Sequence, residues 1–325
     1  MIKLFKYLFC IICLSALSSN AQNSDFIPTL YRSVPTLLNP AAVGSSDYLR
    51  LRAGARLETL GIHGAKKNFI GTADAPYKIK EQNIGAGLII NNASFDYFRN
   101  IIIEGQGSYR IPLKKGFLSA GISIGYFHTT FQGDKINSDS NISEGEINEE
   151  LPREKVKGGS LDFGLGIRYE TELLSIGISG LHLNNPKLTL SNKGNMNTDL
   201  PHVESNLPAS IYFETSGNIP IKNSLFKLQP SLVLGTDFSH ISSVLDLGVT
   251  WKDMVTFGLD YRWKKAAGIF AAVTIKDFFI GYSWEYQTVA DKKRSSGNHE
   301  LIIGYQFRLI QPKKGIYRQR SIRLM

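Results

Sequence analysis

The chain contains very little cysteine and no long hydrophobic run. Both cysteines, Cys10 and Cys13, lie near the N-terminus, so the remainder of the 325 residues can form neither a disulfide nor a cysteine-ligated metal site. Beyond the N-terminus no stretch reaches the about 20 apolar residues that a membrane-spanning helix requires. An inner-membrane helical protein is therefore excluded.

Motifs of cofactor and catalytic sites are also missing. No Gly-x-Ser-x-Gly elbow introduces a helix, and the pairs Gly85/Gly87 and Gly164/Gly166 fall inside expected strands, where glycine permits barrel curvature. The sequence thus predicts a protein that is not an enzyme and has no cofactor, metal or catalytic residue. The histidines are scattered without metal-ligand spacing: His63, His128, His182, His202, His240 and His299.

The N-terminus has the pattern of an export signal. Lys3 and Lys6 precede an apolar run from Tyr7 to Leu17, and Ser19 and Ala21 supply small residues before a cleavage site. Residues 1–21 are therefore predicted to be a signal peptide, removed after Ala21. Neither cysteine follows a small-residue lipobox, which argues against a lipoprotein.

The net charge of +9 comes almost entirely from the two ends of the chain. Of 37 basic residues, two lie in the signal and six lie between Arg308 and the C-terminus, which leaves 29 against 28 acidic residues. A nucleic-acid-binding protein would be expected to carry a basic face on its folded part. The charge distribution therefore disfavours nucleic acid as a partner.

The mature sequence alternates apolar and polar residues over segments of about ten. Val255, Phe257 and Leu259 alternate with Thr256 and Gly258, and the same period recurs along almost the whole chain. A period of two places one apolar and one polar face on a strand. Behind an export signal, this pattern predicts an all-β, transmembrane antiparallel barrel of the outer membrane. The expected strands, about 14 in number, cover 48–58, 65–77, 83–92, 98–111, 117–131, 160–170, 173–183, 208–220, 225–238, 241–251, 254–264, 268–275, 278–288 and 298–309.

Loop lengths support a barrel over a soluble sandwich. Every second connection is tight, whereas those at 132–159, 184–206 and 288–297 are longer and polar. Short periplasmic turns and longer external loops are typical of outer-membrane barrels. An even strand number would place both termini in the periplasm. The polar face would line the lumen with charged residues: Arg50, Arg52, Glu104, Arg110, Asp162, Arg168, Glu214, Asp246, Asp260 and Glu300.

Aromatic residues on the apolar face are expected to form interfacial girdles. They are Tyr109, Tyr126, Tyr169, Trp251 and Tyr305.

Both ends of the mature chain carry motifs that resemble a known family. The first is Thr36-Leu-Leu-Asn-Pro-Ala-Ala-Val-Gly44, and the second is Ser296-Gly-Asn-His-Glu-Leu301 in the last hairpin. With the strand segment from Gly85 to Asn92, they are similar to the PorP/SprF family of type IX secretion system outer-membrane proteins of Bacteroidota. Ala42 and Asn298 differ from the residues usual there. This leaves open whether the chain is a core-machinery member or a cargo-dedicated paralogue.

The resemblance implies a barrel of about fourteen strands that works with the type IX secretion and gliding machinery. It implies secreted cargo, notably large adhesins, and periplasmic and outer-membrane machinery proteins as partners, besides outer-membrane lipid. Two other functions remain possible from the sequence. A FadL-like transporter of small hydrophobic molecules would require an apolar path through the lumen, and a hydrolase would require a Ser/His/Asp cluster at the outer rim.

Residues 22–47 are predicted to be an N-terminal plug segment before a barrel at 48–309. Pro40 disfavours helix at Asn39, and an asparagine can bond to nearby backbone. Asn39, Pro40, Ala41 and Gly44 therefore either anchor the N-terminus inside the barrel or contact a partner. The anchoring interpretation is favoured.

The motif in the last hairpin, with Gly297, His299 and Glu300, is predicted to be structural. Although His299 and Glu300 could form an acid–base pair, adjacent strand residues face opposite ways.

The segment 310–325 is a basic tail beyond the last strand, predicted to lie in the periplasm. It is either a solvated end or an arm that docks an acidic surface. Its basic residues are Lys313, Lys314, Arg318, Arg320 and Arg323.

Overall fold

The computed structural model describes residues 26–62, 64–138, 152–190, 203–288 and 295–309. The signal peptide expected at 1–21 and the basic tail expected at 310–325 lie outside these residues. Within the described part of the chain, no helix has the length and apolarity needed to cross a membrane.

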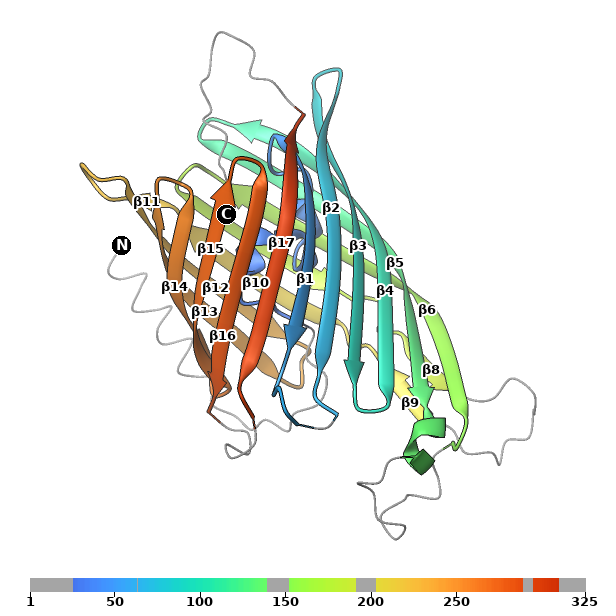
Figure 1. Ribbon diagram of the computed structural model, residues 1–325. Coiled ribbons are helices and arrows are strands. Elements are labelled where there is room, and N and C mark those ends of the chain that lie inside the picture. The colour runs from blue at the N-terminus through green and yellow to red at the C-terminus, as the bar shows by residue number, and fades with distance from the viewer. Residues whose placement is uncertain (1–25, 63, 139–151, 191–202, 289–294, 310–325) are drawn as a thin grey trace.

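Fourteen antiparallel strands form a closed barrel, as the alternation predicted (Figure 1). Sequential strands pair with each other, β1 pairs with β17, and β10 pairs with β12. Closure satisfies the backbone groups that an open sheet edge would expose to lipid. The wall strands are β1 (Tyr48–Leu57), β2 (Lys67–Ile79), β3 (Gln82–Phe95), β4 (Phe98–Leu113), β5 (Gly116–Gln132), β6 (Lys155–Glu170), β7 (Leu174–Leu181), β10 (Ser210–Gly217), β12 (Phe226–Thr236), β13 (Ile241–Trp251), β14 (Val255–Arg262), β15 (Ala266–Ile275), β16 (Phe278–Gln287) and β17 (Asn298–Arg308).

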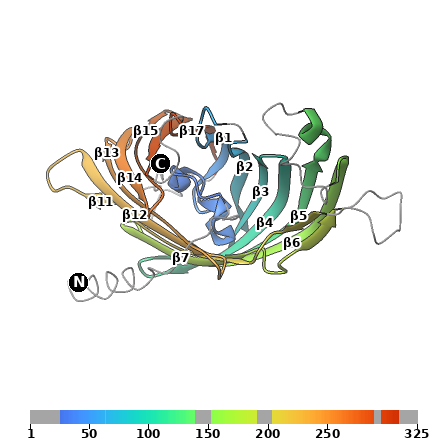
Figure 2. The same cartoon turned by 90° about the horizontal axis from the view of Figure 1, so that it is seen from below.

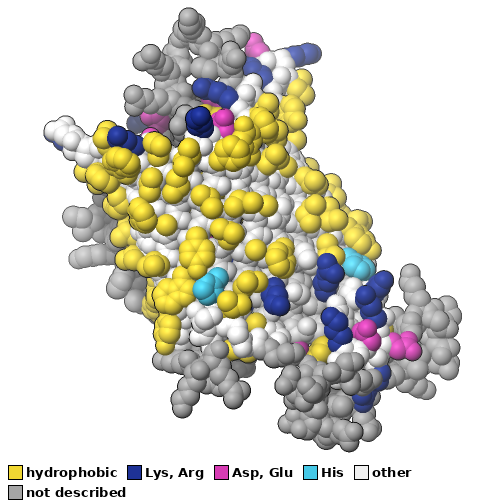
Figure 3. All heavy atoms as spheres, in the orientation of Figure 1, with side chains coloured by type: hydrophobic (Ala, Val, Ile, Leu, Met, Phe, Trp, Pro, Cys, Tyr) yellow, Lys and Arg dark blue, Asp and Glu magenta, His cyan; other side chains and the backbone are white. Residues whose placement is uncertain are grey.

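The two faces of the wall follow the sequence period. Leu259 and Phe278 are 61% and 65% exposed on the outside, whereas their neighbours Asp260 and Phe279 are buried on the inside. Figure 3 shows hydrophobic side chains spread over the outer surface of the strands. Since the outside must contact lipid and the inside must hold the charged residues, the register of each strand is determined by this alternation.

The long connections contain more structure than the sequence indicated. Strand β6 begins at Lys155 rather than at residue 160, because Lys155–Ser160 continue the ladder with β5 although Gly158 and Gly159 interrupt the alternation. A short helix, η4 (Gly133–Ser138), follows β5. The segment expected as a plain loop at 184–206 contains a separate hairpin of β8 (Lys187–Leu190) and β9 (Val203–Asn206). Leu190 and Val203 of this hairpin pack with Phe131 and Val156.

The connections differ at the two ends of the barrel. At one end five of the six connections between wall strands have two or three residues, including 80–81, 114–115 and 276–277, and the sixth, 218–225, contains the two-residue β11 (Ile219–Pro220). At the other end the connections 133–154, 182–209 and 288–297 are long, but those at 96–97, 237–240 and 263–265 are short. With 58–66, four of the seven connections at that end are long. The expected sorting of loops by length therefore holds for these four connections only.

The N-terminal segment lies inside the barrel. Figure 2 views the molecule from below and shows this segment between the opposite walls. It contains three short 3-10 helices, η1 (Tyr31–Ser33), η2 (Pro35–Leu37) and η3 (Pro40–Ala42). We refer to residues 26–47 as the plug.

Candidate functional site: the plug and its buried ion pairs

The conformation of the plug follows from its prolines and Asn39. Pro35 and Pro40 each occupy the first position of a 3-10 helix, where the missing N–H is not needed. Asn39 has an extended backbone, and its side-chain oxygen accepts a hydrogen bond of 2.9 Å from the Ala41 amide. The sequence expectation that Pro40 ends helix at Asn39, whose side chain bonds to nearby backbone, is confirmed.

Asn39 also connects the plug to the far wall of the barrel. Its Nδ2 donates to Glu214 Oε1 at 3.2 Å and to the Ile167 carbonyl at 3.3 Å. Glu214 forms an ion pair with Arg168, and both side chains are about 5% exposed or less. The amide of Asn39 therefore completes a buried polar group that would otherwise lack one partner. This agrees with the anchoring interpretation of the motif.

Glycines on the facing strands make room for this contact. A Cβ atom at Gly121 would lie 2.3 Å from the Pro40 carbonyl carbon, and one at Gly166 would lie 2.1 Å from Asn39 Oδ1. Similarly, a Cβ at Gly85 would lie 2.2 Å from the Val43 carbonyl oxygen. Gly85 and Gly166 were expected to permit barrel curvature, but in the structure they make room for the plug.

The C-terminal end of the plug is bound by two arginines and an aspartate. Asp74 pairs with Arg50 at 2.7 Å and accepts a 3.0 Å hydrogen bond from the Gly44 amide. Arg110 donates to the Gly44 carbonyl at 2.8 Å, and Ser108 donates to the Val43 carbonyl at 2.6 Å. Gly44 has a φ of 64°, and a Cβ there would lie 2.6 Å from Gly85 Cα. Only glycine fits both requirements without strain.

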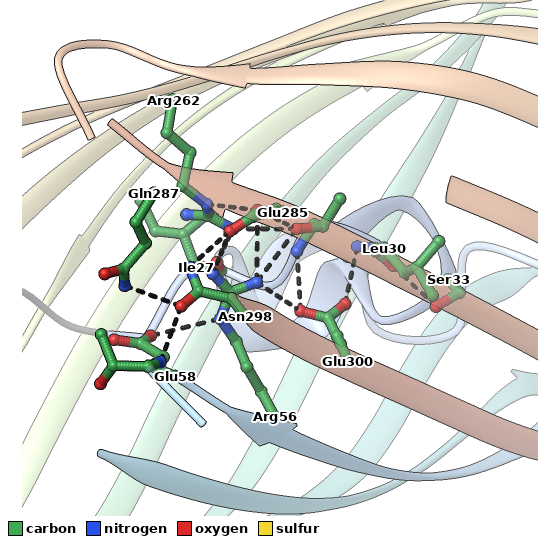
Figure 4. Close-up of polar contacts among 12 residues, drawn as sticks. Ile27, Leu30, Ser33, Arg56, Glu58, Arg262, Glu285, Gln287, Asn298 and Glu300 are labelled. Carbon is green, nitrogen blue, oxygen red and sulfur yellow. Dashed lines mark hydrogen bonds and ion pairs between the residues drawn. The ribbon is translucent and has the colours of Figure 1, made fainter. Parts of the chain in front are cut away.

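Glu300 binds the N-terminal end of the plug (Figure 4). Its two carboxylate oxygens accept hydrogen bonds from the Thr29 and Leu30 amides at 3.0 and 2.8 Å. Arg56 Nη1 pairs with the same carboxylate at 3.1 Å. Glu300 is 1% exposed, so the motif residue from the last hairpin acts on the plug and not at the surface.

Glu285 is the centre of the same network. It pairs with Arg56 and with Arg262, the latter at 2.7 Å, and accepts from Asn298 at 2.9 Å. Arg262 also donates to the plug carbonyl of Ile27 at 2.7 Å. The buried Arg56 and the half-buried Arg262 thus balance two buried carboxylates, and the plug backbone completes their hydrogen bonding.

Glu58 lies at the rim next to this network and pairs with Arg56 at 3.2 Å. Burial alone would raise the pKa of Glu58, but the charges of Arg56, Lys66 and Arg262 outweigh this effect and hold the pKa below its ordinary value.

Apolar residues of the plug pack against residues that face the lumen. Tyr31 and Leu38 pack with Leu181, Tyr212 and Val244. On the other side of the plug, Leu30 and Val34 pack against four lumen-facing residues of the wall: Ile70, Ala272, Phe279 and Ile302. These side chains are almost fully buried, so apolar contacts add to the polar ones in holding the plug.

The other residues of the hairpin motif have different positions. His299 faces outward, as predicted, and its Nδ1 lies 2.7 Å from the hydroxyl of Tyr282. Gly297 has a φ of 96° at the rim, and its carbonyl accepts from the Leu60 amide. His299 and Glu300 therefore lie on opposite faces of β17 and cannot act as an acid–base pair. The basic residues of the tail lie outside the described residues.

One lumenal cluster has the chemistry of a cation site. Glu104, Asp162 and His182 each place a ligand atom within 4.8 Å of the others, and all three are buried. The His182 Nδ1 lies 2.7 Å from Asp162 Oδ2. Carboxylate oxygen and imidazole nitrogen can ligate divalent metals. The scattered histidines did not reveal this group, because β4, β6 and the residue after β7 come together only in the barrel.

Replacing Asn39 by alanine should loosen the plug. The change removes the cap of η3 and one hydrogen bond to Glu214, for an expected cost of about 1–3 kcal/mol. Amide hydrogen exchange at residues 36–43 should accelerate roughly tenfold or more. Gln82→Ala at the exposed end of β3 is the control, and exchange in the plug should not change. Equal exchange in Asn39→Ala and the parent protein would show that Asn39 does not hold the plug.

Comparison with protein families finds a family model that matches most of this chain. A family model described as "Type IX secretion system membrane protein PorP/SprF" matches residues 19–305. Comparison with curated proteins finds no match.

Solved structures with a similar fold include two monoaromatic hydrocarbon channels and an outer membrane protein. A TodX monoaromatic hydrocarbon channel mutant has a TM-score of 0.50 at 11% identity, covering 91% of this chain and 98% of that chain. The CymD monoaromatic hydrocarbon channel has a TM-score of 0.45 at 12% identity, covering 88% and 94%. Omp33 of Acinetobacter baumannii has a TM-score of 0.43 at 6% identity, covering 81% and 99%. At 11% identity the likeness to the TodX channel shows the barrel fold alone.

Proposed function

Because the chain belongs to the PorP/SprF family of type IX secretion system membrane proteins, we propose that it is a non-enzymatic outer-membrane scaffold of that system. In this role it supports the export or surface attachment of secreted cargo, such as large adhesins. The observation that carries the proposal is the plug, which occupies the lumen and is bound by buried ion pairs at both of its ends. With the lumen occupied, the loops and the tail are the surfaces left for partners.

The proposal includes a division of the chain and an orientation. Residues 1–21 direct export, residues 22–47 form the plug segment, residues 48–309 form the barrel, and residues 310–325 form a periplasmic arm. Both termini then face the periplasm, and the end with the long loops faces the cell exterior. The even number of wall strands supports this arrangement, because the first strand then begins at the same rim of the barrel at which the last strand ends.

The alternative is a FadL-like transporter of small hydrophobic molecules. The likeness in fold to monoaromatic hydrocarbon channels and the N-terminal segment in the lumen keep it in consideration. Such a transporter needs an apolar path. The lumen instead contains buried charged groups at several levels, including Arg50, Asp74, Arg168 and Glu285. This composition favours the scaffold, since a hydrophobic solute would have to pass charged side chains.

Deletion of the gene followed by surface proteomics separates the two functions. The scaffold predicts that one or more cargo proteins of the type IX system disappear from the cell surface and that the wild-type gene restores them. Unchanged surface display of every such cargo, together with lost uptake of a small hydrophobic molecule, would show that the protein is a transporter.

Removal of the tail should weaken partner binding without unfolding the barrel. A variant that ends before Gln311 should still shift in mobility on heating in electrophoresis, because no wall strand is lost. It should co-purify less of the periplasmic machinery, since five positive charges are removed. The control is a full-length variant with the same five residues replaced by glutamine, which should behave like the truncation. Undiminished co-purification in both variants would leave the tail as a solvated end.

A further inference from the structure

The outer face of the barrel carries positive charge in one place. Among the lipid-facing positions of the fourteen wall strands, the charged residues are Lys67, Arg99, Lys155 and Lys157, and all four are exposed. They lie on β2, β4 and β6, at the end of the barrel with the long loops. Figure 3 shows Lys and Arg side chains gathered toward the lower right of this surface.

Three of these residues form a single row across the wall. Lys67 pairs with Ser94, Ser94 with Arg99, Arg99 with Thr130, and Thr130 with Lys157. Neighbouring strands lie about 4.8 Å apart, so successive charges are about 10 Å apart along the row. We call Lys67, Arg99 and Lys157 the basic row. Lys155 lies two residues before Lys157, closer to the rim and next to Glu154.

The basic row has unused capacity for anions. Arg99 Nε donates to Asn92 Oδ1 at 3.2 Å, and no carboxylate of the described residues forms an ion pair with the three side chains. Lipid-facing charge is unfavourable, by about 2–4 kcal/mol at mid-bilayer and less near the interface. Three cations on one sector therefore need a favourable partner or free access to water.

A purely interfacial role would not explain why the charges occur in one sector. On β14 and β16, the lipid-facing residues at the same end of the barrel are aromatic: Tyr261, Trp284 and Tyr286. Such residues are the usual anchors of a barrel at the interface. The sector of β2 to β6 has cations in their place, which indicates a ligand of negative charge.

The next outward-facing row below the basic row contains Asn92, Ile101, His128 and Gly159, and beyond that row the surface becomes apolar. Ile90, Ile103, Tyr126 and Leu161 form a row four residues farther along the strands into the bilayer, each 44–56% exposed. Cations above an apolar surface match a lipid whose headgroup carries phosphate and whose acyl chains lie along the wall.

We propose that the basic row binds the phosphates of a phosphorylated glycolipid of the lipopolysaccharide class in the outer leaflet. The proposal rests on the orientation given above, in which the long-loop end faces the cell exterior. The long side chains of Lys67 and Lys157 can extend toward the headgroup while their stems cover apolar surface. Arg99 can offer two parallel donors to one phosphate.

The test uses the full-length protein in nanodiscs, with bisphosphorylated lipid A and its dephosphorylated form as probes. Wild-type protein should bind the bisphosphorylated form more tightly, and added salt should reduce the difference. The variant K67Q/R99Q/K157Q should lose about tenfold or more in affinity for the bisphosphorylated form, if each contact contributes as much as a favourable exposed ion pair. The matched control K78Q/K80Q/K115Q removes three exposed charges at the opposite end and should keep wild-type affinity.

Several results would overturn the proposal. These are equal affinity of the row variant and wild-type protein, an equal loss in the control, or equal binding of the two lipid forms. Heat-modified mobility verifies that each variant is folded. Because the assay measures lipid binding without secretion, its failure is distinct from failure of the scaffold function, which surface proteomics tests separately.

Discussion

Replacement of Arg56 by methionine should lower the free energy of unfolding by about 3–5 kcal/mol. Arg56 contacts both Glu285 and Glu300, and all three side chains are at most 2% exposed. Methionine is also unbranched but carries no charge, so two carboxylates would remain buried and close together with only Arg262 to balance them. Urea unfolding of the protein in lipid vesicles measures the change.

A matched control comes from the same arginine. Glu58 also pairs with Arg56 but its side chain is 30% exposed at the rim. Glu58→Gln should therefore cost no more than about 1 kcal/mol. A similar loss for both variants would mean that the buried network contributes no more than a surface ion pair, and the proposed role of Arg56 in holding the plug would be wrong.

Replacement of Gly121 by leucine should displace the plug and open the lumen to ions. The new Cβ would lie 2.3 Å from the Pro40 carbonyl carbon, which is backbone and cannot move aside as a flexible side chain could. The barrel wall keeps its own ladder of hydrogen bonds, so the clash is relieved by moving the plug. Single-channel recording in planar bilayers should show conductance several times that of the wild-type protein.

Two further variants make this result interpretable. At Gly107, on the lipid-facing side of β4, a Cβ would meet no atom within 4 Å, so Gly107→Leu should conduct like the wild-type protein. Gly166→Ala, which would place a Cβ 2.1 Å from Asn39 Oδ1, tests the same contact with a smaller change. If neither Gly121→Leu nor Gly166→Ala alters conductance while both remain folded, the plug does not control access through the lumen.

The Gly121→Leu variant also tests the proposed function, through its surface display of cargo and its uptake of hydrophobic molecules. If the plug is displaced by Gly121→Leu and cargo still reaches the surface, then the barrel supports secretion through its loops or tail. If the displaced variant instead gains uptake of hydrophobic molecules, the lumen is a conduit that the plug closes.

Strand positions could be predicted because the barrel is determined by short-range alternation. Each strand needs only its own apolar and polar faces to choose between lipid and lumen. For this reason the ten charged residues that were expected to face the lumen all lie on that side of the wall, for example Arg52 and Asp246. The β8–β9 hairpin was missed, because its strands are only four residues long and show little alternation.

Partners within the lumen could not be predicted in the same way. Arg168 and Glu214, both expected to face the lumen, form an ion pair with each other. Asp246 and Asp260 lie opposite each other on β13 and β14 and have no ion-pair partner among the described residues. Alternation specifies the side of the wall on which a residue lies, but not which residue it meets across the barrel.

The plug shows most clearly which features the local sequence determines and which ones depend on the folded barrel. The sequence by itself determined that Asn39 and Pro40 form a local turn, because the proline ring and the short amide act within two residues. Only the tertiary structure decided that Glu300 binds the Thr29 amide, a contact between residues 271 positions apart. It also decided that Gly121 and Gly166 make room for the plug. Such contacts exist only after the barrel has closed, because closure sets the distance between opposite walls and the space left between them.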